Sequence, residues 1–264
     1  MLWHEMSWLE LAEVDKNLPV VIPLGSCEQH GHHLPVFVDT IQVSAIAEKI
    51  EKNQTQNIIL LPTFWLGSSH HHKDFPGTLS LRPLLYAQVL QEMTRSILRA
   101  GFKRLFFLNG HGGNRIPALD ALNDLVADDD LADQAFLAVA SWWEFLRDEA
   151  EVNSLLEQDA ISHACEYETS AMLALKPELV RMQNIVSSSP ALSNEWYHTE
   201  NDRRCRVSMV RRMHRLTGAG SMAASAQGTK EKGHLIVEVA VAQITKFLQD
   251  FVTWPDLPPL GPRA

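Results

Sequence analysis

The feature that most constrains the fold of this chain is a regular alternation of short apolar runs with longer amphipathic segments. The short runs have the composition of buried strands and cover residues 19–24, 57–61, 103–108 and 135–141. Helical patterning follows or separates them, over residues 40–52, 83–100, from Asn114 onward, 169–175 and 230–251. Such alternation favours a mainly parallel sheet with helices on both faces. We therefore predict one three-layer α/β/α domain over residues 1–254 and a Pro-rich tail over 255–264.

Composition excludes several classes of protein. The chain has 264 residues, of which 45% are hydrophobic and 21% charged, as in an ordinary soluble globular protein. Its formal net charge of -9 argues against a general nucleic-acid binder. Cys27, Cys165 and Cys205 are odd in number and lack Cys-x-x-Cys spacing, which predicts a reducing compartment. Without a signal-peptide pattern or a long apolar run, we expect a cytoplasmic protein with no membrane partner.

One local basic cluster interrupts the acidic background: Arg203, Arg204, Arg206, Arg211, Arg212 and Arg215. It could bind an anionic substrate or contact a neighbouring subunit. A charge run of this kind is more often a solvated or interface face, so it does not by itself predict a site.

Metal-type ligands follow two of the predicted strands. Glu28 and His30 come directly after the first strand, and Asp39 follows nine residues later. His111 lies in Asn-Gly-His-Gly-Gly-Asn, directly after the third strand. Ligands bind beyond the carboxyl ends of strands in open sheets, so these side chains are expected to meet. The mixed oxygen and nitrogen donors suit Zn, Mn or Fe, although Asp39 could instead cap a helix.

Two further segments carry candidate site residues. If a helix begins near His163, then Glu166 shares its face and Glu168 points elsewhere. One of these carboxylates could then bind metal while the other orients a ligand or carries a proton. A charged helix N-terminus is the structural alternative. The adjacent histidines at 70–72 cannot all face one ion, so we expect one to point into the site.

Ordered motifs from about residue 8 to 175 resemble the creatininase (creatinine amidohydrolase) family. The motifs that carry the resemblance are Gly25-Ser-Cys-Glu-Gln-His-Gly-His-His-Leu-Pro with Asp39, Phe75-Pro-Gly-Thr-Leu-Ser-Leu, Asn109-Gly-His-Gly-Gly-Asn and His163-Ala-Cys-Glu-Tyr-Glu-Thr-Ser. The resemblance implies a creatininase-like α/β fold, a dinuclear metal site and a homo-oligomer, commonly a hexamer.

The resemblance also implies roles for single residues. Glu28 and His111 would bind one ion, His30 would bind the other, and Asp39 would bridge them. Creatininases proper have a glutamate ligand where this chain has Gly113, and Glu166 is the candidate to replace it. His163 would be the proton shuttle. Glu168 would orient a metal ligand or shuttle a proton, and His72 matches the family's histidine before Phe-Pro-Gly-Thr.

The chain departs from creatininases proper at two aromatic positions. Gly112 stands where they carry a tyrosine, and Asp159 stands where they carry a tryptophan. Those aromatic side chains pack on the creatinine ring, so their absence argues against creatinine itself as the substrate. The pair Gly112-Gly113 resembles the Gly-Gly branch of the family. Trp142 and Trp143, which follow the fourth strand, could line a pocket instead.

Together these features predict a metal-dependent amidohydrolase that cleaves a non-peptide C–N bond, in a cyclic amide or a formamide. Two divalent ions, Zn, Mn or Fe, would activate a water molecule for attack on a small-molecule substrate. Three alternatives remain open at this stage. They are a lactone or sugar-ring hydrolase, a peptide hydrolase on the same site, and a non-catalytic metal-binding homologue.

Overall fold

The computed structural model describes residues 1–54, 56–158, 161–186, 192, 194–197, 206–222, 224–258 and 260–261. Asp159, Arg203, Arg204 and Cys205, which figured in the sequence analysis, lie outside the described residues. Within the described part, no helix combines the length and the apolar composition that crossing a bilayer requires.

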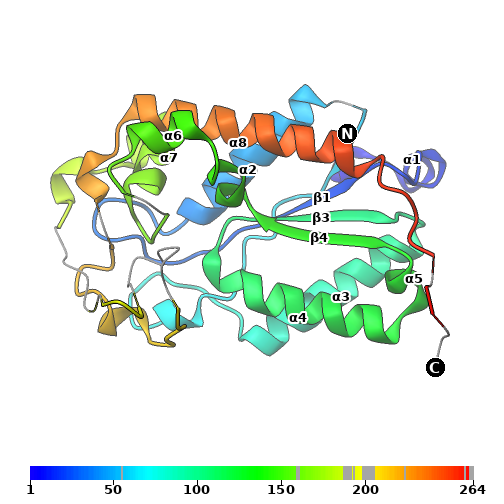
Figure 1. Cartoon of the computed structure of the whole chain (residues 1–264), viewed down its shortest axis with the longest axis horizontal. Helices are drawn as coiled ribbons and strands as arrows, with labels where there is room; N and C mark the ends of the chain where they lie inside the picture. The colour runs from blue at the N-terminus through cyan, green and yellow to red at the C-terminus, as the bar shows by residue number, and fades with distance from the viewer. Residues whose placement is uncertain are drawn as a thin grey trace.

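A parallel sheet forms the middle layer (Figure 1). Its described strands lie in the order β2 (Ile59–Leu60), β1 (Val20–Leu24), β3 (Arg104–Asn109) and β4 (Phe136–Ser141). Every residue of β1 and β3 is buried, as expected of central parallel strands that are covered on both faces. The predicted mainly parallel sheet is confirmed, although β2 is shorter than the predicted run.

Helices cover both faces of this sheet. On one face lie α2 (Val38–Asn53) and the long C-terminal α8 (Lys230–Phe251), with α6 (Ala150–Leu155) and α7 (Glu166–Leu175) beside them (Figure 1). On the other face lie α3 (Pro83–Arg99), α4 (Arg115–Asp128) and the short α5 (Asp130–Asp133). The N-terminal α1 (Trp8–Glu13) lies outside these layers. The predicted three-layer α/β/α architecture is therefore confirmed.

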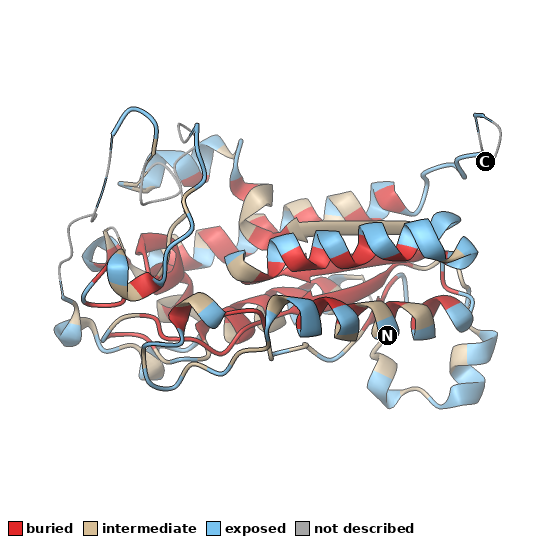
Figure 2. Cartoon of the chain, turned by 90° about the horizontal axis from the view of Figure 1, so that it is seen from below, coloured by how far each residue is buried: buried red, intermediate tan, exposed pale blue. Residues whose placement is uncertain are grey.

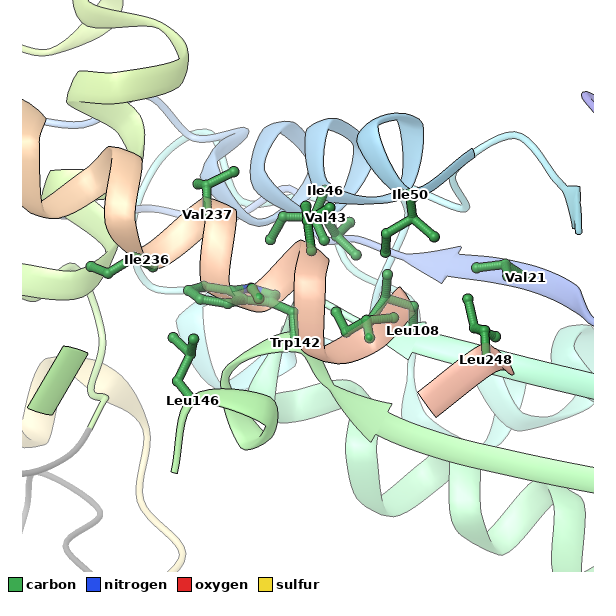
Figure 3. Close-up of a cluster of buried hydrophobic side chains, with 14 of the residues drawn as sticks. Val21, Val43, Ile46, Ile50, Leu108, Trp142, Leu146, Ile236, Val237 and Leu248 are labelled. Carbon is green, nitrogen blue, oxygen red and sulfur yellow. The ribbon is translucent and has the colours of Figure 1, made fainter. Parts of the chain in front are cut away.

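The strands divide their side chains between two cores because successive residues point to opposite faces. Val21 and Leu108 pack with α2 and α8, whereas Ile22 and Phe107 pack with α3 and α4. Figure 2 shows the result, since the strands and the inner sides of the helices are buried. Trp142 lies in the first core, close to α8 (Figure 3), so the structure does not place it in a pocket.

Local signals explain where the helices that carry the site begin. The described α2 starts at Val38 with Phe37 as its N-cap, so Asp39 lies inside the first turn and does not cap the helix. The described α7 starts at Glu166, earlier than the predicted residue 169. Both helices thus bring carboxylates of their first turn to the same end of the sheet, beyond the carboxyl ends of β1 and β3.

Candidate metal centre

Five charged or imidazole side chains converge beyond the carboxyl ends of β1 and β3. This ligand cluster comprises Glu28, His30, Asp39, His111 and Glu168, and all of them are buried. The loop after β1 supplies the first two, α2 supplies Asp39, the turn after β3 supplies His111, and α7 supplies Glu168. The structure thus brings together four of the five residues that the sequence analysis predicted as ligands.

One half of the cluster is centred on His111. Its Nδ1 lies 3.2 Å from Glu28 Oε1 and 3.2 Å from Asp39 Oδ2. Its Nε2 lies 3.2 Å from Ser69 Oγ, which holds the ring from behind. Asn109 fixes the turn, since its Oδ1 accepts from the His111 amide at 3.1 Å. This arrangement resembles an oriented metal-ligating histidine, whose second nitrogen donates to a nearby oxygen.

The other half is centred on His30. Its Nε2 lies 3.1 Å from Asp39 Oδ1 and 3.7 Å from Glu168 Oε1. Its Nδ1 lies 3.1 Å from the Glu28 carbonyl oxygen, to which it donates in the neutral ring. That hydrogen bond leaves Nε2 as a bare acceptor facing two carboxylates. Asp39 therefore contacts both halves, with one oxygen directed at each.

Several buried atoms in the cluster lack hydrogen-bond partners among the described residues. They are Glu28 Oε2, His30 Nε2 and Asp39 Oδ2. Buried polar atoms in folded proteins nearly always have a partner, and an unpaired buried carboxylate is especially costly. With His30 in its neutral form all of these atoms are acceptors, so a divalent cation would satisfy them together. The donor set accordingly fits divalent metal binding, and groups such as Glu28, His30 and Asp39 offer ligand atoms within 4.8 Å of one another.

The electrostatics of the cluster point the same way. Burial raises the pKa of Glu28, against the opposing effect of His111. Burial disfavours the charged form of His111, but Glu28 and Asp39 outweigh it and raise the pKa to about 10. Asp39 and Glu168 likewise hold the pKa of His30 well above its ordinary value despite burial. Without a cation, protons on these imidazoles must balance the carboxylates, and a divalent ion would replace those protons.

Two further histidines border the cluster in neutral form. His163 Nδ1 and His72 Nε2 each lie 3.5 Å from Glu28 Oε1. Burial lowers the pKa of both rings, with the charge of His30 as the next cause for His163. His163 Nε2 lies 2.7 Å from the Gln29 carbonyl oxygen, so it donates there and leaves Nδ1 as an acceptor toward the cluster. The structure therefore brings both predicted residues to the site.

Gln29 was missed by the sequence analysis. Its side-chain Nε2 lies 3.1 Å from His72 Nδ1 and 3.0 Å from His163 Nε2, and it donates to the Gly220 carbonyl at 2.9 Å. The amide donates to His72 Nδ1 and to the Gly220 carbonyl, whereas His163 is held by the Gln29 backbone carbonyl oxygen. Its position between Glu28 and His30 in the same motif was the only signal that could have found it.

Glu166 is the predicted ligand that the structure does not bring to the cluster. Its carboxylate accepts from Lys232 Nζ at 2.5 Å and from the Glu157 amide at 2.9 Å, facing α8 and the loop before α7. The expected shared helix face with His163 is wrong, because α7 begins only at Glu166. Ala164, with φ 51°, interrupts the chain between them. Glu168 points to the cluster instead, with Oε2 held by the Ala164 amide at 2.5 Å.

A cavity of about 320 Å³ opens in front of the ligand cluster. Burial lowers the pKa of His71 to about 3, and this ring lines the cavity together with His72, while His70 is exposed. More than one of the adjacent histidines thus faces the site, contrary to expectation. The lining also includes a set of mostly apolar side chains, here called the apolar wall: Trp143, Tyr197, Met209, Met213 and Met222. Of the two tryptophans expected to line a pocket, Trp143 lines this cavity, whereas Trp142 is in the core.

The chain resembles known proteins over most of its length. The family model described as creatininase, creatinine amidohydrolase, matches residues 4–248. The chain therefore belongs to the creatinine amidohydrolase family, and the predicted class of a hydrolase acting on C–N bonds is confirmed at that level.

Individual relatives show how broad the likeness is. The chain is 28% identical over 259 residues to a creatinine amidohydrolase of Pseudomonas putida. The matched region covers 93% of this chain and 95% of that enzyme. It is 33% identical over 176 residues to a mycofactocin precursor peptide peptidase of Mycolicibacterium smegmatis, covering 65% of this chain and 64% of that one.

Solved structures share the fold. A structure titled "Creatininase Mn" superposes with a TM-score of 0.79 at 26% identity, covering 94% of this chain and 97% of that one. A mutant creatininase of "Zn-Zn type" gives a TM-score of 0.79 at 27% identity, with the same coverage. The layered fold that positions the ligand cluster is therefore common to this chain and to these enzymes.

Proposed function

We propose that this protein is a metal-dependent amidohydrolase that uses two divalent ions to hydrolyse a non-peptide C–N bond in a small, uncharged substrate. The observation that carries the proposal is the position of Asp39, whose two oxygens face His30 Nε2 at 3.1 Å and His111 Nδ1 at 3.2 Å. A carboxylate with one oxygen toward each of two imidazoles is suited to bridge a pair of ions.

The ligands divide into two sets around that bridge. Glu28, Asp39 and His111 would hold one ion, and His30, Asp39 and Glu168 would hold the other. Glu168 thus takes the place that the sequence analysis gave to Glu166, because only Glu168 faces His30. Zn and Mn are the favoured metals, since related solved creatininases are named for each of them, and Fe also suits the donors.

A pair of bound ions would supply an activated water and would polarise the substrate carbonyl. The chain itself must then move protons. His163 is neutral and presents Nδ1 toward the cluster, 3.5 Å from Glu28 Oε1. We propose that Nδ1 accepts a proton from the attacking water and passes it to the leaving nitrogen. The Gln29 carbonyl oxygen orients the His163 ring through Nε2, and the Gln29 side-chain amide orients His72. Such a group contributes roughly 10²–10⁴-fold to the rate.

The cavity supports a substrate without net charge. Its described lining contains no lysine or arginine, and it includes the apolar wall. A phosphorylated substrate would need cationic partners there. A formamide or a cyclic amide meets these conditions. A peptide bond is the second candidate, because one relative is named a peptide peptidase. The cytoplasmic location and the hexamer remain predictions.

The first experiment counts metal ions. Purified protein, reconstituted with Zn or Mn, is measured by inductively coupled plasma mass spectrometry as wild type, Glu168→Gln and Glu166→Gln. We expect two ions per chain in wild type, about one in Glu168→Gln and two in Glu166→Gln. One ion or none in the reconstituted wild type would overturn the dinuclear site.

The second experiment defines the bond. The reconstituted protein is assayed with formamides, cyclic amides, lactones and short peptides, with release of amine and of acid recorded separately. Amine release from the first two groups supports the proposal. Turnover confined to lactones, without amine release, or confined to peptides would replace it with the corresponding alternative.

A further inference from the structure

We propose that His71 is an additional ligand of the ion held by Glu28, Asp39 and His111. This inference rests on the proposed function and deepens it, because it extends the ligand set of one ion to a residue from the His70–His72 turn. That turn is a 3-10 helix, in which successive side chains point about 120° apart. His70, His71 and His72 therefore cannot share one direction.

The directions of these rings separate their roles. His72 faces Glu28 and the Gln29 amide, and His70 is exposed to solvent. His71 instead lies flat against His111, with ring centroids 5.6 Å apart and planes inclined by 14°. A ligand atom of His71 falls within 4.8 Å of ligand atoms in both Glu28 and His111. These three side chains could thus surround one ion.

The ring nitrogens of His71 are available for such a bond. Among the described residues, no hydrogen bond is found to either nitrogen of His71, whereas His72 and His111 each have a partner on the side away from the cluster. His71 also lines the cavity, so its lone pair can reach the space in front of the carboxylates.

Gly113 provides the room that His71 occupies. A Cβ atom at this position would lie 2.4 Å from His111 Nε2, 2.5 Å from the Ser68 carbonyl oxygen and 2.7 Å from His71 Cε1. Any side chain there would displace one of the two imidazoles. At the neighbouring Gly112, by contrast, a Cβ would meet nothing within 4 Å. Gly113 is therefore the glycine of this turn that allows His71 to approach His111.

The test uses variants that separate ligation from stacking. His71→Phe keeps a flat ring against His111 but removes the nitrogens, and His71→Gln removes the ring. His70→Phe is the matched control, because it changes the exposed neighbour in the same turn. Each protein is loaded with Co²⁺, its affinity is measured by competition with a chelator, and its visible absorption spectrum is recorded. Thermal unfolding of the metal-free proteins checks that each variant is folded.

We expect both His71 variants to weaken one of two Co²⁺ sites by at least about tenfold and to change the absorption spectrum, with His70→Phe like wild type. If His71→Phe keeps the wild-type Co²⁺ affinity and spectrum, His71 is not a ligand and only stacks on His111. A wild type that binds no Co²⁺ would overturn both this inference and the proposed function. Two wild-type sites that are unaffected by His71→Phe would overturn this inference alone.

Discussion

The two parts of the cavity lining, the ligand cluster and the apolar wall, are built in different ways. The ligand cluster comes from strand ends and first helical turns, and each of its side chains is buried and held by neighbouring groups. The apolar wall comes largely from the segment after α7, and its Tyr197, Met209 and Met222 are only half-buried. Chemistry is thus placed on the rigid scaffold and substrate contact on loops, a division common among enzymes. Changes in the two parts should therefore have different kinds of effect.

The largest effect is expected for Asp39→Ala. Removing the residue that faces both His30 and His111 leaves neither half of the cluster complete. We expect metal content to fall from two ions toward none and turnover to fall to the background rate. Metal analysis and an amine-release assay measure the two effects. Asp120→Ala, on the exposed side of α4, should match wild type in both. Full metal content in Asp39→Ala would mean that the cluster is not the site.

His163→Gln tests whether proton transfer by His163 can be separated from metal binding by the neighbouring ligand cluster. We expect kcat to fall by roughly 10²–10⁴-fold with metal content unchanged, because the imidazole is assigned to the leaving nitrogen and not to an ion. Steady-state kinetics on the metal-loaded protein measure the loss. His234→Gln, on the exposed face of α8, is the control. Loss of an ion together with activity would identify His163 as a ligand instead.

Gly113→Ala compares two adjacent glycines in one turn. Its new methyl group would displace His71 or His111, and we expect the affinity for one metal ion to weaken by about tenfold. Gly112→Ala, with open space around its new Cβ, should leave that affinity unchanged. Chelator competition with Co²⁺ gives both values. Equal affinities in the two variants would contradict the packing argument for His71.

The smallest effect is expected on the apolar wall. Met209→Ala removes a half-buried apolar side chain from the cavity, which should cost about 1 kcal/mol of substrate binding and raise KM about fivefold. The value of kcat and the metal content should stay unchanged, since no ligand is touched. The adjacent Val210, 88% exposed, provides the control Val210→Ala. A fall in kcat without a change in KM would place Met209 in the catalytic machinery.

Much of the scaffold and most of the cluster could be predicted from sequence. Alternating patterns indicated the sheet and its helices, and parallel strands bring their carboxyl ends to one edge. Glu28, His30 and His111 follow two such strands directly, so their meeting required no further information. Asp39 could be predicted as a member of the cluster because it lies at the start of α2. These are consequences of local pattern and topology together.

The choice between Glu166 and Glu168 was decided only by the tertiary structure. Both lie in the first turn of α7. The direction of each depends on where the helix begins and how it packs on α8, and the positive φ of Ala164 separates His163 from the helix. Lys232 on α8 then pairs with Glu166, while Glu168 is left to face His30. The sequence pattern alone does not specify these rotations.

The same division applies to the cavity. By itself the sequence determined which segments supply metal-type ligands, because that depends on residue type and on position after a strand. Only the tertiary structure decided which neighbour of a pair enters the cavity, as with Trp143 rather than Trp142. It also decided that Met209, Met213 and Met222 belong to the lining. Those outcomes depend on the packing of segments that are far apart in the chain, and local sequence patterns do not predict such packing.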